Sequence, residues 1–266
     1  MESIANLRIS LIQTSLFWEN RQQNLSHIEG LIGGLKGKTD IIVLPEMFSS
    51  GFSMNTSSAY DTMEGETMVW LSKMAHSLAT VICGSIKVKE KDKFYNRFIW
   101  MMPNGDWQKY DKRHLFSFAE EDKHFTKGEE KLLIEYKGWK IFPLICYDLR
   151  FPVWSKNKLL NGAAEYDLLI YTANWPEVRK VAWQSLLLAR AIENQAFVAG
   201  VNRVGIDGKM IAYSGDSAII NPYGAYLSEA QNGHEDIIHA ELDHSLLADF
   251  RKKFPVLNDA DEFIIK

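Results

Sequence analysis

A thiol, a carboxylate and an amine each stand just after a predicted strand in this sequence. Cys146 follows the apolar run 141–145, which is rich in branched residues, Glu46 follows an apolar run and one proline, and Lys112 comes shortly after the predicted strand that ends at Tyr110. Such runs are typical of strands. In an open α/β sheet, ligands bind beyond the carboxyl ends of the strands, where rigid backbone presents side chains to a substrate. We therefore expect the three side chains to meet at one rim.

Each of these residues also has a purely structural interpretation. Free cysteine is among the most buried residue types and usually packs as a small hydrophobic side chain. A Glu or Lys that follows a strand most often lies in a solvated loop. The other cysteine, Cys83, stands in an apolar run with no charged neighbour, so we expect it in the core. The catalytic hypothesis for Cys146 thus depends on Glu46 and Lys112 lying near it.

If the three side chains converge, they can hydrolyse an amide. A thiol with a reference pKa of about 8.5 needs a base or a cation before it attacks a carbonyl. Glu46 is the candidate base and Lys112 the candidate cation. The Lys112 ammonium and the backbone N–H of Tyr147 are candidate donors to the tetrahedral oxyanion, and one such donor is worth roughly 3 kcal/mol. Glu46 would then protonate the departing ammonia and activate water against the thioester.

This chemistry needs no metal and no cofactor, and the histidines show no tight metal-ligand spacing. A Cys–His enzyme that uses His114 or His124 as its base is an alternative mechanism. Replacement of Glu46 should abolish turnover in the first mechanism, whereas only loss of His114 should do so in the second.

Composition restricts the class of protein. The chain has 266 residues, 46% hydrophobic residues and a net charge of −4, with scattered Lys and Arg. We expect one domain over residues 1–266 that acts on a small molecule, with neither nucleic acid nor membrane as its main partner. Two cysteines in unlike contexts form no disulfide framework, and we see neither a membrane span nor an export signal, so we expect a cytoplasmic protein.

Hydrophobic periodicity predicts a layered α/β domain in which helices and strands are intermixed along the chain. A terminal arm at about 249–266 carries apolar residues without clear periodicity, so we expect it to pack on its own domain or on a partner subunit. The predicted helices span 20–35, 65–79, a stretch after Cys146 to about 160, and 178–195; the predicted strands span 7–13, 40–44, 81–88, 94–102, 106–110, 141–145, 167–171, 197–202 and 236–242, with a further hairpin within 209–228.

Separate sequence blocks, in order, resemble the signatures of the nitrilase or carbon–nitrogen hydrolase superfamily. They are Leu-Pro-Glu-Met-Phe at 44–48, Tyr-Asp-Lys-Arg-His-Leu-Phe at 110–116, Ile-Cys-Tyr-Asp-Leu-Arg-Phe-Pro at 145–152 and Ala-Arg-Ala-Ile-Glu-Asn-Gln at 189–195. The resemblance implies a Glu-Lys-Cys triad at Glu46, Lys112 and Cys146. It also implies a four-layer α-β-β-α sandwich that commonly forms a homodimer.

Many members of this superfamily have a second active-site Glu after the lysine block. Glu120 and Glu121 are adjacent here, and we favour Glu121. The sequence around Lys112 and Cys146 most resembles that of the omega-amidase branch, whose members hydrolyse the terminal amide of 2-oxoglutaramate and 2-oxosuccinamate.

Arg150 is the candidate partner for a substrate carboxylate, because guanidinium binds carboxylate in a bidentate way. Alternatively, Arg150 has a structural role and pairs with Asp148 or with a helix end. Phe116, Asn174 and Trp175 are candidate pocket walls. Hydrolysis of a nitrile, an N-carbamoyl acid or another amide is an alternative activity, and a catalytically silent binding or scaffold protein is an alternative of another class.

Overall fold

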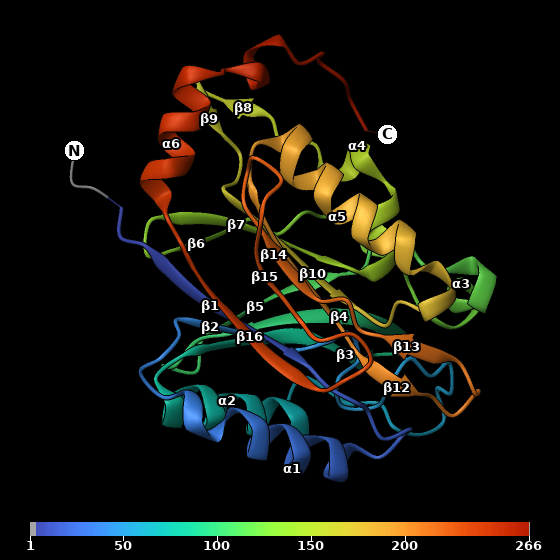
Figure 1. Cartoon of the computed structure of the whole chain (residues 1–266). Coiled ribbons are helices and arrows are strands. Elements are labelled where there is room, and N and C mark those ends of the chain that lie inside the picture. The colour runs from blue at the N-terminus through green and yellow to red at the C-terminus, as the bar shows by residue number, and fades with distance from the viewer. Residues whose placement is uncertain (1–3, 266) are drawn as a thin grey trace.

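Two six-stranded sheets lie face to face between helices in the computed structural model, which describes residues 4–265 (Figure 1). The first sheet has the order β16 (Asp236–Leu242), β1 (Leu7–Gln13), β2 (Ile41–Val43), β3 (Val81–Glu90), β4 (Lys93–Met101) and β5 (Trp107–Asp111). The second has the order β15 (Tyr226–Glu229), β14 (Ala218–Ile220), β11 (Phe197–Asn202), β10 (Leu168–Ala173), β7 (Trp139–Ile145) and β6 (Ile134–Tyr136).

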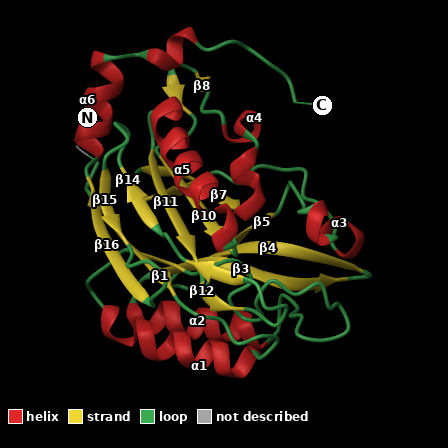
Figure 2. Cartoon of the chain, turned by 45° about the vertical axis from the view of Figure 1, so that its right-hand side comes forward, coloured by secondary structure: helices red, strands yellow, loops and turns green. Residues whose placement is uncertain are grey.

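Helices cover the outer faces of both sheets (Figure 2). The first sheet is covered by α1 (Arg21–Ile32) and α2 (Glu66–Leu78), and α5 (Lys180–Asn194) lies on the second sheet with the short α4 (Pro152–Ser155) beside it. The predicted α-β-β-α sandwich is therefore confirmed. The remaining elements are α3 (Glu121–His124), α6 (His244–Lys253), the two-stranded pairs β8 (Leu159–Leu160) with β9 (Ala163–Ala164) and β12 (Val204–Ile206) with β13 (Ala212–Ser214), and the 3-10 turns η1 (Gly33–Leu35), η2 (Ser117–Ala119), η3 (Cys146–Arg150), η4 (Glu177–Arg179) and η5 (Val256–Asp259).

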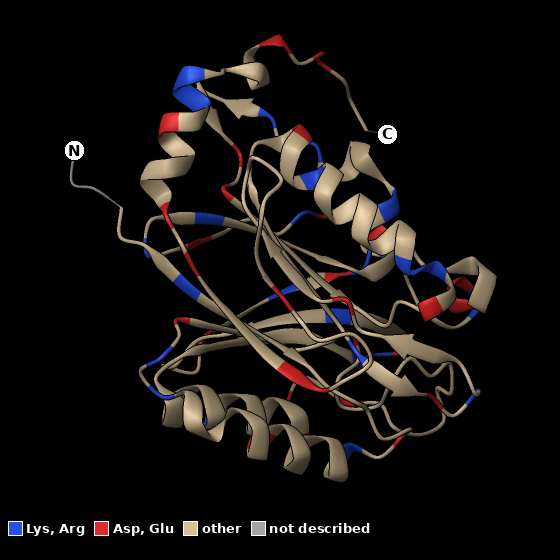
Figure 3. Cartoon of the chain, in the orientation of Figure 1, with Lys and Arg blue, Asp and Glu red and all other residues tan. Residues whose placement is uncertain are grey.

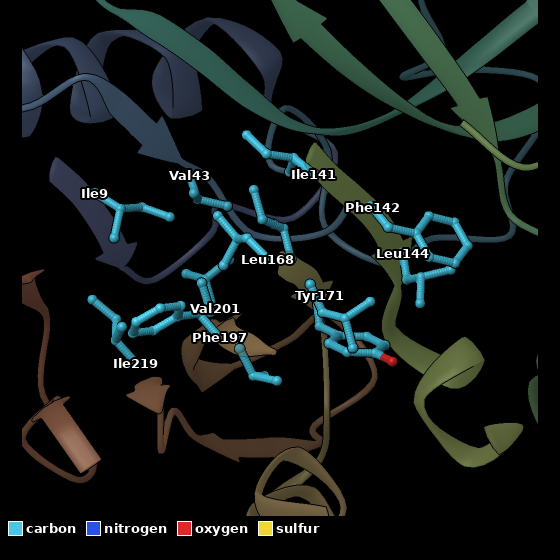
Figure 4. Packing of buried hydrophobic residues seen from close by; sticks show 14 of the residues in the cluster. Ile9, Val43, Ile141, Phe142, Leu144, Leu168, Tyr171, Phe197, Val201 and Ile219 are labelled. Carbon is cyan, nitrogen blue, oxygen red and sulfur yellow. The ribbon is translucent and has the colours of Figure 1, made fainter. Parts of the chain in front are cut away.

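The largest hydrophobic core fills the space between the two sheets. Ile9 and Val43 from the first sheet point toward Ile141, Leu168 and Phe197 from the second (Figure 4). Their alternation follows from the strand period of two, which sends every second side chain to the inner face. Each fully buried side chain of this size contributes about 1.5–3 kcal/mol relative to exposure, so the relative position of the two sheets is strongly determined.

Strand direction brings several chain segments to one edge of the sandwich. In the first sheet β1, β2 and β3 are parallel, and two antiparallel steps make β5 run the same way. In the second sheet β7, β10 and β11 are parallel. The segments that follow β2, β5, β7 and β10 carry Glu46, Lys112, Cys146 and Asn174, respectively.

The loop that carries Glu46 packs closely against β3 at Gly84. A Cβ atom at this glycine would lie 2.8 Å from the Cβ of Leu44 and 3.0 Å from the ring of Phe48. Only a residue without a side chain lets the segment after β2 pass this close to its neighbouring strand. Gly84 thus helps to determine the depth at which Glu46 enters the sandwich.

Some predicted elements differ from the structure. The helix expected from Cys146 to about residue 160 ends at Ser155, and the chain then forms the small β8–β9 hairpin. The buried Asn157 stabilises this turn, because it donates to Tyr166 and Asn194 and accepts from the backbone of Glu165. Such a short polar side chain competes with helical hydrogen bonds.

The hairpin expected within 209–228 is present as the antiparallel pair β14 and β15, which a turn at 221–225 joins. Its first arm is shorter than expected, because residues 212–214 form β13, which pairs with β12 in a separate two-stranded sheet. The tail after residue 249 begins as part of α6, whose N-cap Asp243 accepts from the backbone of Ser245 and Leu246. The residue that this helix buries is Leu247, which lies before residue 249, so the apolar residues of the expected arm did not reveal the helix.

No helix in the described part of the chain is both long and apolar enough to cross a membrane. Lys and Arg are scattered among Asp and Glu along the ribbon (Figure 3).

Candidate active site

Glu46, Lys112 and Glu121 form one buried cluster. The Lys112 Nζ donates to Glu46 Oε1 at 2.8 Å and to both carboxylate oxygens of Glu121, at 2.9 and 3.1 Å. All three side chains are inaccessible to solvent. The neighbouring Glu120 instead has a side chain that is 59% exposed and pairs with Lys123 at 2.6 Å. The structure thus brings Glu121, and not Glu120, to the predicted rim.

An asparagine and a backbone amide complete the cluster. Asn96, in the middle of β4, donates its side-chain amide to Glu46 at 2.8 Å and to Glu121 at 3.0 Å. The second oxygen of Glu46 accepts from the backbone N–H of Asn174 at 2.8 Å, and the Asn174 side chain donates to the backbone carbonyl of Glu46. Sequence reasoning missed Asn96; the available signal was one Asn within an otherwise buried strand.

The neighbouring carboxylates keep Lys112 charged. Burial disfavours the ammonium of Lys112, but the carboxylates of Glu121 and Glu46 outweigh it and raise the pKa of Lys112 above its ordinary value. Burial and the Glu46 charge raise the pKa of Glu121, while the Lys112 ammonium opposes them. Lys112 is therefore a permanently protonated donor whose position is held by two carboxyl groups.

Cys146 lies at the end of β7 in a strained backbone conformation. Its φ is +45°, in the left-handed region that residues with a side chain rarely adopt, and it opens the turn η3. Its Sγ lies 3.9 Å from the backbone carbonyl of Asn174. The turn directs the thiol out of the sheet while the strand behind it remains fixed.

The thiol is protonated at rest. Burial raises the pKa of Cys146 well above its ordinary value, and the Glu46 carboxylate raises it further, whereas Lys112 acts in the opposite direction. The groups that act on the thiol thus include all three members of the buried cluster. Attack by this sulfur requires a base that removes its proton as the new bond forms.

Asp148 connects the cysteine turn to the lysine loop. Its carboxylate accepts from the backbone N–H of Ile145 and of His114, both at 3.0 Å, and from the hydroxyl of Tyr110 at 2.8 Å. It also bonds the His114 ring at 2.8 Å, and that ring stacks on Phe151. Since η3 and the segment before Lys112 share this one carboxylate, the thiol and the ammonium are held in a defined relation.

Neither candidate histidine base is placed to act on the thiol. His114 is engaged by Asp148, as described above, and His124 is exposed on α3. In the described part of the chain, no hydrogen bond joins a histidine to Cys146. The structure therefore favours Glu46 over a Cys–His pair.

A narrow pocket opens over Cys146. The predicted wall residues Phe116, Asn174 and Trp175 line it, and so do Tyr147, the predicted oxyanion donor, and Arg150, the predicted carboxylate partner. The lining also includes three residues that sequence reasoning missed: Phe52, Pro176 and Arg179. Arg150 forms no ion pair with Asp148; its guanidinium stacks over the ring of Trp175 at 4.8 Å. The pocket thus combines aromatic walls, a thiol and two cationic side chains.

Two further expectations concern cysteine and metal. Cys83 is fully buried, and burial raises its pKa, as expected for a core residue. Across residues 4–265, no group of three or more His, Cys, Asp or Glu side chains is arranged to hold a metal ion.

Comparison with known proteins identifies the family. Residues 8–252 match the carbon-nitrogen hydrolase family. The chain is 46% identical to omega-amidase YafV of Escherichia coli K12 over 97% of this chain and 98% of that one. It is 34% identical to a 2-oxoglutaramate amidase of Bacillus subtilis, over 94% and 96% of the two chains.

A solved structure gives the same assignment. A carbon-nitrogen hydrolase superfamily protein of Xanthomonas campestris, whose crystal structure holds an arsenic adduct in its active site, superposes with a TM-score of 0.96. It is 41% identical, and the match covers 98% of this chain and 100% of that chain. The resemblance seen in the sequence blocks is confirmed: the chain belongs to the carbon–nitrogen hydrolase family of the nitrilase superfamily, and it is an enzyme that hydrolyses amides.

Proposed function

We propose that the enzyme is an omega-amidase, with Glu46, Lys112 and Cys146 as its catalytic triad. Its substrates would be small 2-oxo dicarboxylic acid monoamides such as 2-oxoglutaramate and 2-oxosuccinamate. The observation that carries this proposal is the buried Glu46–Lys112–Glu121 cluster beside a protonated thiol, at the base of a pocket with cationic side chains. The names of the relatives in E. coli and B. subtilis support the same substrate class.

Acylation uses the groups in a fixed order. Glu46 takes the proton of Cys146 as the sulfur attacks the amide carbon, and the carbonyl becomes an oxyanion. The Lys112 ammonium and the Tyr147 N–H stabilise this oxyanion; Tyr147 is the second residue of η3, where N–H groups lack partners within the helix. Glu46 then gives the proton to the departing nitrogen, and the C–N bond breaks. Ammonia leaves, and a thioester remains on Cys146.

Deacylation repeats the sequence with water. Glu46 removes a proton from a water molecule that attacks the thioester carbon, and Lys112 again stabilises the oxyanion. Collapse of this intermediate breaks the C–S bond, releases the carboxylic acid and returns the proton to the sulfur. One carboxylate thus serves both half-reactions, which explains why its two oxygens need separate donors to keep it in place.

Glu121 is a positioning residue in this mechanism. It contacts Lys112 through both oxygens, and one of them also accepts from the Phe116 backbone at 2.6 Å. Its function would be to hold the ammonium at the oxyanion site.

Arg150 is proposed to bind the substrate carboxylate at the pocket mouth. Its guanidinium is stacked on Trp175, which leaves the in-plane N–H groups free for a bidentate contact. Phe116, Asn174 and Trp175 would form the walls between this carboxylate and the thiol. A homodimer in the cytoplasm remains our prediction, which sedimentation and fractionation can test.

A substrate panel that follows ammonia release tests the proposal. We expect efficient turnover of 2-oxoglutaramate and little of nitriles, N-carbamoyl acids or neutral amides. Glu46→Gln should abolish turnover in a folded protein. With a slowly hydrolysed substrate, mass spectrometry should find the acyl group on Cys146. Turnover of a nitrile without any 2-oxo acid amide would overturn the substrate assignment, and absence of every adduct would favour a silent scaffold.

A further inference from the structure

Two arginines in the described part of the chain make no side-chain hydrogen bond, and both lie in the pocket. These are Arg150 and Arg179. Every other arginine donates at least one side-chain hydrogen bond to a carboxylate or a backbone carbonyl: Arg8, Arg21, Arg97, Arg113, Arg190, Arg203 and Arg251. A guanidinium has five donors and keeps its charge, so two that no protein group engages at one site are both available to bind an anion there.

Arg179 is held in place although it forms no ion pair with an Asp or Glu among residues 4–265. Its guanidinium lies over the rings of Phe116, at 5.6 Å, and Phe118, at 5.1 Å. Its backbone carbonyl accepts from the indole N–H of Trp175 at 2.9 Å. Trp175 is itself fixed to β11, because its backbone N–H donates to Asn202 Oδ1 at 2.8 Å and its carbonyl accepts from the same side chain. Stacking and backbone anchoring reduce the freedom that binding would otherwise remove.

The position of Arg179 is tied to the catalytic cluster. The Phe116 ring beneath its guanidinium belongs to a residue whose backbone N–H donates to Glu121, and Glu121 holds Lys112. The anchor on its other side, Trp175, follows Asn174, whose backbone N–H donates to Glu46. Because Phe116 and Trp175 both fix Arg179, its guanidinium keeps a constant position relative to the thiol of Cys146.

We propose that Arg179 is the second arm of the carboxylate site and determines selectivity for an acidic substrate. This inference rests on the proposed function and names a residue beyond the triad and Arg150. Arg150 approaches from the turn after β7, with its guanidinium on Trp175, and Arg179 approaches from the turn before α5, with its guanidinium on Phe116. The aromatic walls contact the short carbon chain of the substrate. The two guanidinium groups bind its terminal carboxylate while its amide reaches Cys146.

The experiment compares two amides of equal chain length, one with a terminal carboxylate and one neutral, in four proteins. The proteins are the wild type, Arg179→Met, Arg179→Lys and Lys180→Met. Methionine keeps an unbranched stem that can lie on Phe116 but removes the charge and the donors. Lys180→Met is the matched control, because it removes an equal charge one residue later, outside the pocket lining.

We expect Arg179→Met to lower the ratio of kcat/KM for the acidic amide over the neutral one by roughly 10- to 100-fold, mainly through KM. Arg179→Lys should retain part of the selectivity, and Lys180→Met all of it. An unchanged ratio in Arg179→Met, or an equal loss in Lys180→Met, would overturn the inference. A wild type that prefers the neutral amide would instead refute the proposed function, so the two failures are distinguishable.

Discussion

Replacement of Glu121 by glutamine tests how the buried cluster places its lysine. The carboxylate accepts four contacts: two from Lys112, one from the Phe116 backbone and one from Asn96. Each oxygen serves Lys112 and one other donor. Whichever end of the glutamine carries the NH2 group, two donors therefore face a donor instead of an acceptor.

The magnitude follows from these contacts. Loss of hydrogen bonds to a charged group costs about 1.5–3 kcal/mol. Burial and the Glu46 charge disfavour the ionised form of Glu121 and raise its pKa. Glutamine carries no charge, so the loss of this unfavourable interaction offsets part of the cost. We expect a net loss of about 2 kcal/mol in the free energy of unfolding, and a Tm lower by roughly 4–8 °C. Displacement of Lys112 from the oxyanion should lower kcat by about 100-fold, with a smaller change in KM.

The assay measures ammonia release under saturating substrate and thermal unfolding of the same samples. Glu120→Gln is the matched control, since its side chain is exposed and pairs with the exposed Lys123. It should leave the Tm and kcat at their wild-type values, because surface substitutions away from special features change little. A wild-type kcat in Glu121→Gln, or a comparable loss in Glu120→Gln, would refute the reasoning.

Three further changes test other parts of the structure. Asp148→Asn should lower kcat and destabilise the fold by about 2–4 kcal/mol, because one carboxylate holds the turns of both Cys146 and Lys112; steady-state kinetics and urea unfolding check this, and unchanged kcat would contradict it. Cys83→Ala should leave acyl labelling of Cys146 and kcat intact, since Cys83 is a core residue, and mass spectrometry of the labelled peptide decides. Although burial opposes ionisation of Glu235, hydrogen bonds from Ser15, Thr14 and His27 lower its pKa to about 2. Its stabilising contribution is thus complete above the unfolded pKa of about 4.3 and declines as the pH falls toward 2, so Glu235→Gln should cost more stability at pH 7 than at pH 3 in urea titrations; an equal cost at both pH values would contradict it.

The sequence by itself predicted a layered α/β domain, and the resemblance of its blocks predicted the sandwich and the three reacting groups. Apolar runs mark buried strands, and a polar residue just after such a run can lie at the sheet edge, where ligands bind. Glu46 and Cys146 follow such runs and Lys112 follows β5, so the three residues leave their strands at the same edge. The helix expected to continue to about residue 160 failed because Asn157 forms a tertiary network that a local pattern does not reveal.

Only the tertiary structure decided which neighbours complete the site. Glu120 and Glu121 are identical in type and adjacent, but a left-handed backbone at Glu120, with a φ of +62°, separates their directions and leaves just one of them facing Lys112. Asn96 and Arg179 contact residues that are far away in the sequence. No local sequence pattern reveals such contacts. Contacts of this kind depend on how two sheets and their loops pack together, since hydrogen bonds between remote segments form only once burial has fixed the segments against each other.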